Sequence, residues 1–100
     1  MTKKAVVLRI PKGIHLRIAG SLAKKANEFK SDIYIEYKEA VADCKSVMGV
    51  AILGLMEGTE LTISANGPDE SKALLSICSF LENDIESKTD CEIFEKYVVG

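Results

Sequence analysis

The sequence contains few cysteines and no long run of apolar residues. Cys44, Cys78 and Cys91 are odd in number and lack the spacing of metal ligands, so they indicate reduced thiols rather than a metal site. No stretch is apolar over enough residues to span a membrane, and the N-terminus has no signal-peptide pattern. We therefore expect a cytoplasmic protein with no membrane insertion, no metal and no cofactor.

An excess of basic residues is also missing. Lys and Arg number 13 against 15 for Asp and Glu, which gives a formal net charge of -2 and a sequence pI near 5.4. A general nucleic-acid binder usually carries a basic surface, so this class of function is disfavoured and any anion site must be local. With 100 residues and 47% apolar content, the chain is long enough to bury one core and too short for two.

The only histidine, His15, lies at a predicted junction between a strand and a helix. The first backbone N–H groups of a helix lack intrahelical partners, so an anion beside His15 would find donors there, and Arg17 adds a guanidinium group. An imidazole titrates near neutrality and acts as a nucleophile, so the stretch suits transfer of a phosphoryl group onto His15 and off again. From these residues alone, a solvated or helix-capping histidine is an equally good interpretation.

Residue spacing predicts seven elements. Strands are expected over residues 4–10, 32–38, 40–43 and 61–65, and helices over residues 16–29, 47–53 and from Pro68 to residue 83 or 85. Ser46 is the expected N-cap of the second helix. Half-buried strands and one-sided helices favour an α+β fold, a two-layer open-faced sandwich in which three helices cover one face of a four-stranded antiparallel sheet. The segment from Glu86 onward is compatible with an added turn, an added strand or a mobile tail.

Four short motifs, in register with this βαββαβα order, resemble the HPr family. They are Gly13-Ile14-His15-Leu16-Arg17, Phe29-Lys30-Ser31-Asp32-Ile33, Lys45-Ser46-Val47-Met48-Gly49-Val50 and Leu53-Gly54-Leu55. HPr is the histidine-containing phosphocarrier of the bacterial phosphoenolpyruvate-dependent sugar phosphotransferase system. The similarity covers about residues 3 to 85. It implies an HPr-like domain over residues 1–86, a C-terminal extension over residues 87–100, and the strand order 1-4-2-3.

The resemblance implies a phosphocarrier rather than an enzyme. In the family, the histidine at the position of His15 accepts a phosphoryl group on Nδ1 from enzyme I and passes it to an enzyme IIA. The arginine at the position of Arg17 and the amides at the helix end hold the phosphoryl oxygens. We accordingly expect enzyme I and enzyme IIA as partners of this chain, and we expect it to be a monomer.

A second site follows from the same resemblance. In Gram-positive members the serine at the position of Ser46 is phosphorylated by a dedicated kinase, which creates a form that binds a transcriptional regulator. A serine kinase/phosphorylase and such a regulator are therefore further expected partners. Helix capping alone would also explain Ser46. The docking surface implied by the resemblance comprises Leu16, Lys24, Val47, Met48 and Ala51.

Three residues depart from the family pattern. Ile18 stands where the family has proline, Leu16 where it has a small residue, and Glu39 where a turn glycine is usual. Ile18 restores a backbone N–H in the first helical turn and is expected to place a bulkier side chain beside the site.

Two other functions remain as alternatives. One is a regulatory HPr paralogue, an adaptor in catabolite or nitrogen control that acts through Ser46 and the patch of Val47 and Met48. The other is a ligand- or RNA-binding module, which would need aromatic side chains gathered on an open sheet face. Tyr34 and Tyr37 fall on opposite faces of their predicted strand, and the net charge has the wrong sign, so this module is disfavoured.

Overall fold

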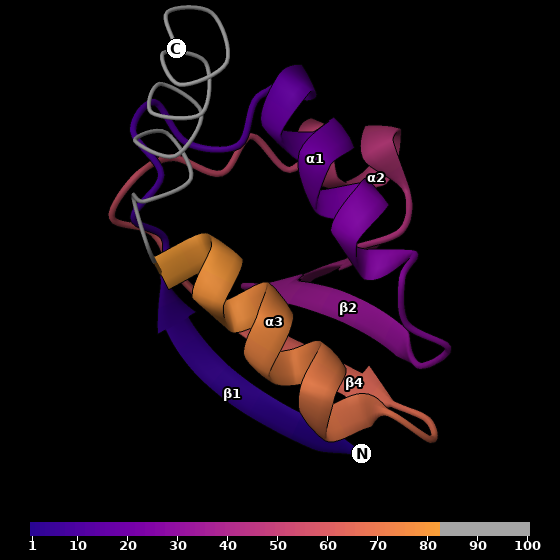
Figure 1. The fold of residues 1–100 in the computed structure, drawn as a ribbon. Helices are drawn as coiled ribbons and strands as arrows, with labels where there is room; N and C mark the ends of the chain where they lie inside the picture. The colour runs from indigo at the N-terminus through magenta and orange to yellow at the C-terminus, as the bar shows by residue number, and fades with distance from the viewer. Residues whose placement is uncertain (83–100) are drawn as a thin grey trace, which may run out of the picture.

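A computed structural model of the chain describes residues 1–82 (Figure 1). The elements are β1 (Thr2–Val7), α1 (Leu16–Ala26), β2 (Asp32–Tyr37), β3 (Ala40–Asp43), α2 (Val47–Ile52), β4 (Glu60–Asn66) and α3 (Glu70–Glu82). The predicted order of strands and helices is confirmed. The predicted domain end at residue 86 and the extension 87–100 lie outside the described residues.

The four strands form one antiparallel sheet in the order β1-β4-β2-β3, as the resemblance implies. The central strand β4 pairs with β1 from Thr2↔Ala65 to Val7↔Glu60, and with β2 on its other side. The two edge strands are therefore β1 and β3. In Figure 1, α3 lies along β1 and β4, while α1 and α2 lie side by side toward the far end of the sheet.

The core lies between the sheet and the helices. Because side chains alternate across a strand, Ile33 and Ile35 of β2 point to the same face, and both are fully buried. The helices cover this face with one apolar stripe each. The largest fully buried side chains are Leu8, Ile10, Ile18, Leu22, Ile33, Ile35, Leu55, Ile63, Ile77 and Leu81.

The first strand lies earlier than predicted. Regular pairing ends at Val7: Leu8 N–H still donates in register to the Thr59 carbonyl at 2.8 Å, but the Leu8 carbonyl accepts from Gly58 N–H at 2.7 Å, and Arg9 N–H donates to the Leu81 carbonyl at 2.8 Å. Leu8 and Ile10 are still completely buried, so the alternation that suggested a strand over residues 4–10 reflects burial of a turn region. The contact of Arg9 with Leu81 fixes the end of α3 beside the loop that leads to His15.

The first helix ends at Ala26 rather than Phe29. Asn27 is the C-cap, and the next two amides donate to carbonyls three rather than four residues back: Glu28 N–H to Lys25 at 3.1 Å and Phe29 N–H to Ala26 at 3.2 Å. The Asn27 side-chain Nδ2 also donates to the Ala23 carbonyl, at 2.7 Å. Phe29 nevertheless packs against the core, which explains why it fits the apolar spacing. In residues 1–82 no helix combines the length and the apolar character that crossing a membrane requires.

The turn between α1 and β2 is fixed by the residue before α3. The Asp69 carboxylate accepts from the backbone N–H groups of Lys30 at 3.0 Å and Ser31 at 2.9 Å, and from the Ser31 hydroxyl. The Ser31 hydroxyl and the Lys30 amide contribute most to lowering the pKa of this carboxyl from 3.8 to about 2. The charged form of Asp69 therefore joins two segments 38 residues apart in the chain.

Candidate functional site

His15 lies at the start of a helix, as predicted, and is the N-cap of α1. Its backbone is extended (φ -96°, ψ -177°), and its carbonyl accepts the first intrahelical hydrogen bond, from Ala19 N–H at 2.8 Å. The side chain is exposed and makes no capping hydrogen bond to its own helix. The imidazole is thus held at a helix start, where backbone donors and a positive dipole end favour an anion, without being used for capping.

A close contact between two loops sets the position of His15. Gly13 adopts a left-handed backbone (φ 73°), and a Cβ atom there would lie 2.2 Å from the Leu55 carbonyl oxygen and 2.7 Å from Met56 Cα. Ile14 N–H donates to the same Leu55 carbonyl at 2.8 Å. Only glycine permits both the conformation and this approach. The loop before α1 is therefore fixed to the loop that follows α2.

The residues after His15 point in different directions. Leu16 is 59% exposed and Arg17 is exposed, so both side chains are accessible to a partner at the start of α1. Ile18 is only 1% exposed and belongs to the core cluster. The expectation that its bulkier side chain lies beside the site is therefore wrong, because the helix turns position 18 inward; only its backbone N–H belongs to the first turn.

Ser46 is the N-cap of α2, as predicted. Its Oγ accepts from Gly49 N–H at 3.1 Å, which is the usual geometry of a capping serine. The residue is exposed. The hydroxyl therefore stabilises the short helix and also faces solvent.

The expected docking residues differ in exposure. Met48 is 62% exposed and Lys24 is exposed, whereas Val47 and Ala51 are half-buried and pack against the core. Since α1 and α2 pack against each other, these residues and the start of α1 belong to the same side of the molecule.

Two exposed apolar residues of this region are not among the docking residues predicted from the sequence. Ile52 is 78% exposed and Met56 is 60% exposed. Ile52 lies four residues after Met48 on α2, so helical spacing from an assumed docking residue would have found it. Met56 comes to the region only through the contact of Gly13 with the loop, which no local pattern indicates.

The described residues 1–82 contain no group of three or more metal-ligating side chains. Cys44 and Cys78 are both buried and free, and burial raises the pKa of each thiol. The chemical groups gathered around the start of α1 are thus an imidazole, a guanidinium and backbone amides, a set suited to holding and transferring an anionic group.

Comparison with known proteins agrees with this arrangement. A family model described as the PTS HPr component phosphorylation site matches residues 2–83. The HPr-like protein Crh of Bacillus subtilis (strain 168) is 32% identical over 85 residues, which are 85% of this chain and 100% of that protein.

Solved structures are similar as well, and two of them illustrate the range. The crystal structure of HPr-C-His from Thermoanaerobacter tengcongensis has a TM-score of 0.79 at 28% identity, covering 84% of this chain and 94% of the other. A crystal structure of Bacillus subtilis Crh, described as a dimer with a swapping domain, has a TM-score of 0.65 at 34% identity, covering 80% and 92%. The chain therefore belongs to the HPr family, and its His15 region lies within the part that matches the family's phosphorylation site.

Proposed function

We propose that the protein is a phosphocarrier in which His15 accepts a phosphoryl group from enzyme I and passes it to an enzyme IIA. The observation that carries the proposal is an exposed imidazole at the N-cap of an 11-residue helix, with no capping hydrogen bond of its own. Nδ1 attacks the phosphorus atom, the bond from phosphorus to the donor breaks, and the reverse displacement hands the group to the next acceptor. As part of the same proposal, the carrier acts in the bacterial cytoplasm.

The neighbouring groups have separate roles in this proposal. The Arg17 guanidinium neutralises the phosphoryl oxygens with a charge-assisted contact, and the first-turn amides of α1 donate to the same oxygens. Leu16, Met48, Val47 and Ala51 form the apolar docking surface, and Lys24 its basic edge. The role of the fold is to hold these groups on one side of the molecule.

Incubation with phosphoenolpyruvate and a generic enzyme I tests the proposal. Intact mass should increase by one phosphoryl group, and brief acid treatment should remove it, because a phosphorylated imidazole is acid-labile whereas a phosphoserine is not. His15→Ala is the matched control and should gain no mass. An adduct that persists in His15→Ala would assign the phosphoryl group to another residue.

A regulatory adaptor remains a second candidate, favoured by the similarity to Crh, which is described as a catabolite repression protein. In this proposal a kinase phosphorylates the exposed Ser46, and the modified start of α2 with Val47 and Met48 binds a regulator. The added charge of about -1.5 to -2 is compatible with a helix N-terminus, so it acts on partners rather than on the fold. An HPr serine kinase should give an acid-stable adduct on the wild type and none on Ser46→Ala. Failure to modify the folded wild type would remove this candidate.

The single chain completes its own sheet, since β1 pairs with β4 over six residues, and we include a monomeric state in the proposal. Because Crh is described as a swapped dimer, light scattering after size exclusion is the direct test. A mass of twice the chain across dilution would overturn this part.

A further inference from the structure

Two residues other than glycine have a left-handed backbone in the described residues 1–82, and both are lysines. Lys12 has a φ of 69° and Lys38 has a φ of 56°. A residue with a Cβ atom rarely adopts this conformation, because the Cβ then lies too close to the following carbonyl oxygen. Strain of this kind persists where other interactions outweigh it, and it is concentrated at functional sites.

A tight turn imposes the conformation of Lys12. Gly13 N–H donates to the Ile10 carbonyl at 2.9 Å, which closes a β-turn with Pro11 and Lys12 at its centre. Proline suits the first central position, and a positive φ at the second is typical of a type II turn, where glycine or asparagine is the usual residue. For the stability of the fold alone, lysine is therefore an unfavourable residue at position 12.

The two lysines differ in what their ammonium groups contact. The Lys38 Nζ lies 5.3 Å from the centroid of the Tyr37 ring, which is a cation–π contact at the turn between β2 and β3. Lys12 is exposed, and no hydrogen bond, ion pair or ring contact joins its side chain to any of residues 1–82. The interaction that accounts for a strained lysine at position 12 therefore lies outside the described fold.

Lys12 is close to the candidate site. The buried residues Gly13 and Ile14 separate it from His15. A Cβ atom on Gly13 would lie 2.7 Å from Met56 Cα, so the Cα atoms of Lys12 and Met56 are at most about 8 Å apart. Met56 is 60% exposed. An unpaired ammonium group thus adjoins an exposed apolar side chain, and protein interfaces combine an apolar centre with a polar rim in this way.

The chain around Lys12 carries charge of one sign. Residues 10–27 contain no acidic side chain and four basic ones: Lys12, Arg17, Lys24 and Lys25. Glu57 follows Met56 in the adjoining loop but forms no ion pair with Lys12. A carboxylate on a partner protein would therefore meet the Lys12 ammonium without competition from an acidic group of the described chain.

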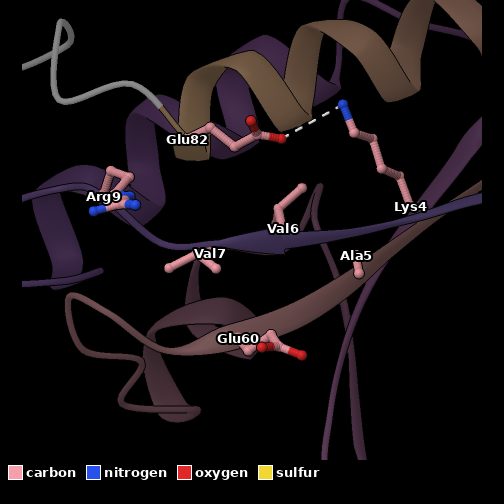
Figure 2. A pocket seen from close by; sticks show the side chains of 7 residues that line it. All are labelled: Lys4, Ala5, Val6, Val7, Arg9, Glu60 and Glu82. Atoms are coloured by element: carbon pink, nitrogen blue, oxygen red, sulfur yellow. Dashed lines mark ion pairs between the residues drawn. The ribbon is translucent and has the colours of Figure 1, made fainter.

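The pocket at the edge of β1 has a different charge pattern. It encloses about 620 Å³, and its charged lining residues are Lys4, Arg9, Glu60 and Glu82 (Figure 2). The dashed line in Figure 2 marks the ion pair of 3.6 Å between the Lys4 ammonium and the Glu82 carboxylate. With two basic and two acidic groups, this edge selects neither sign of charge in a partner. An acidic partner is matched by the surroundings of Lys12 and not by this pocket.

We propose that Lys12 is a docking residue, whose ammonium group pairs with a carboxylate of the partner protein that exchanges the phosphoryl group with His15. The proposal rests on the proposed phosphocarrier function and adds the chemistry of one contact, an acidic side chain of the partner beside Met56. Lys12 contacts the partner rather than the reacting atoms. It therefore contributes to KM and to the affinity for the partner, and this contribution decreases as the ionic strength rises.

The stability of three variants is measured first, by urea unfolding. Lys12→Gly should have a higher urea midpoint than wild type, because glycine adopts a positive φ without steric conflict. Lys38→Gly is the matched control for strain, and its midpoint should rise less, since a cation–π contact is lost. Lys12→Arg keeps both the charge and the strain and should have the wild-type midpoint. A lower midpoint in Lys12→Gly than in wild type would show that Lys12 stabilises the fold itself and would overturn the proposal.

Phosphorylation by enzyme I is measured next, with the carrier as the varied substrate. Lys12→Gly should have a KM about threefold higher at unchanged kcat, which is the effect of an exposed ion pair, and the difference should shrink as salt is added. Lys38→Gly and Lys12→Arg should have the wild-type KM. A lower kcat at unchanged KM would place Lys12 on the phosphoryl group instead, and a wild-type KM in Lys12→Gly would remove it from docking. Either result overturns the proposal.

Binding of the unphosphorylated protein to enzyme I separates this proposal from the proposed function. The Kd measured by titration calorimetry should be about threefold higher for Lys12→Gly than for wild type. Weaker binding of Lys12→Gly to an enzyme I that never phosphorylates His15 would refute the proposed function alone. Equal dissociation constants, with normal phosphorylation of both proteins, would refute the docking role alone.

Discussion

Substitution of Gly13 tests the loop contact that positions His15. Gly13 has a φ of 73°, and a Cβ atom there would lie 2.2 Å from the Leu55 carbonyl oxygen, far inside any real contact. Gly13→Ala therefore carries two costs. The left-handed conformation costs a residue with a Cβ about 1–2 kcal/mol, and the displaced carbonyl adds about 1–3 kcal/mol of overpacking. The free energy of unfolding should fall by about 2–5 kcal/mol.

Two other glycines separate these costs. Gly54 also has a positive φ, 61°, but its Cβ position has no neighbour within 4 Å, so Gly54→Ala should lose only the conformational part, about 1–2 kcal/mol. Gly20 lies inside α1 with neither constraint, so Gly20→Ala should raise the free energy of unfolding by about 0.5–1 kcal/mol. The three variants thus form a ranked series with one chemical change.

Urea unfolding of the three variants and the wild type measures the series and needs no phosphotransfer partner. A Gly13→Ala chain that is unfolded without urea, while Gly54→Ala is folded, agrees with the ranking. The loop contact would be contradicted if the free energies of unfolding of Gly13→Ala and Gly54→Ala differ by less than about 0.5 kcal/mol, the spread of ordinary surface substitutions. The two loops would then not be in contact, and the position of His15 would need another explanation.

Three further predictions follow from single residues. The pKa of about 2 means that charged Asp69 stabilises the fold above pH 3.8 and that this contribution is lost as the pH falls toward 2. The difference in free energy of unfolding between wild type and Asp69→Asn, measured with urea, should therefore shrink over that range. A difference that stays constant would contradict this. Arg17→Ala should slow phosphoryl transfer by about 10- to 150-fold, because a contact of about 1.5–3 kcal/mol is lost, and should leave the free energy of unfolding nearly unchanged. Arg17→Lys should recover part of the transfer rate. Equal transfer rates in Arg17→Ala and wild type would refute a role of Arg17 in holding the phosphoryl group. Ile18→Val should lower the free energy of unfolding by about 0.5–1.5 kcal/mol and leave the rate of phosphoryl transfer unchanged. Ile18→Pro should also be less stable, but it should donate the phosphoryl group faster, because it removes an amide near that group. Equal transfer rates in these two variants would leave Ile18 as a packing residue only.

Much of the fold was predictable from local patterns. The order of elements, the N-cap positions of His15 and Ser46, and the buried faces follow from alternation, helical spacing and capping chemistry. The strand order came only from the family resemblance, because alternation says which face of β4 is buried and not which strands flank it. The early end of β1 was not predictable, since it depends on the bond from Gly58 N–H to the Leu8 carbonyl and on the bond from Arg9 N–H to the end of α3.

The candidate site was predictable only in part for the same reason. His15, Arg17 and Ser46 belong to short motifs, so their neighbourhoods are visible along the chain. Met56 joins the region through a tertiary contact, and Ile18 is directed inward by the phase of α1 relative to the sheet. Such contacts depend on how elements pack, which a residue pattern within one element does not contain.

The central claim is that His15 carries the phosphoryl group on Nδ1. The chain has one histidine, so a long-range ¹H–¹⁵N spectrum of the imidazole contains a single spin system. After reaction with phosphoenolpyruvate and enzyme I, the Nδ1 resonance should move to the position of a phosphorylated nitrogen while Nε2 keeps its proton, and addition of an enzyme IIA should restore the first spectrum. An imidazole spectrum that stays unchanged while the mass of the protein rises by one phosphoryl group would contradict the claim.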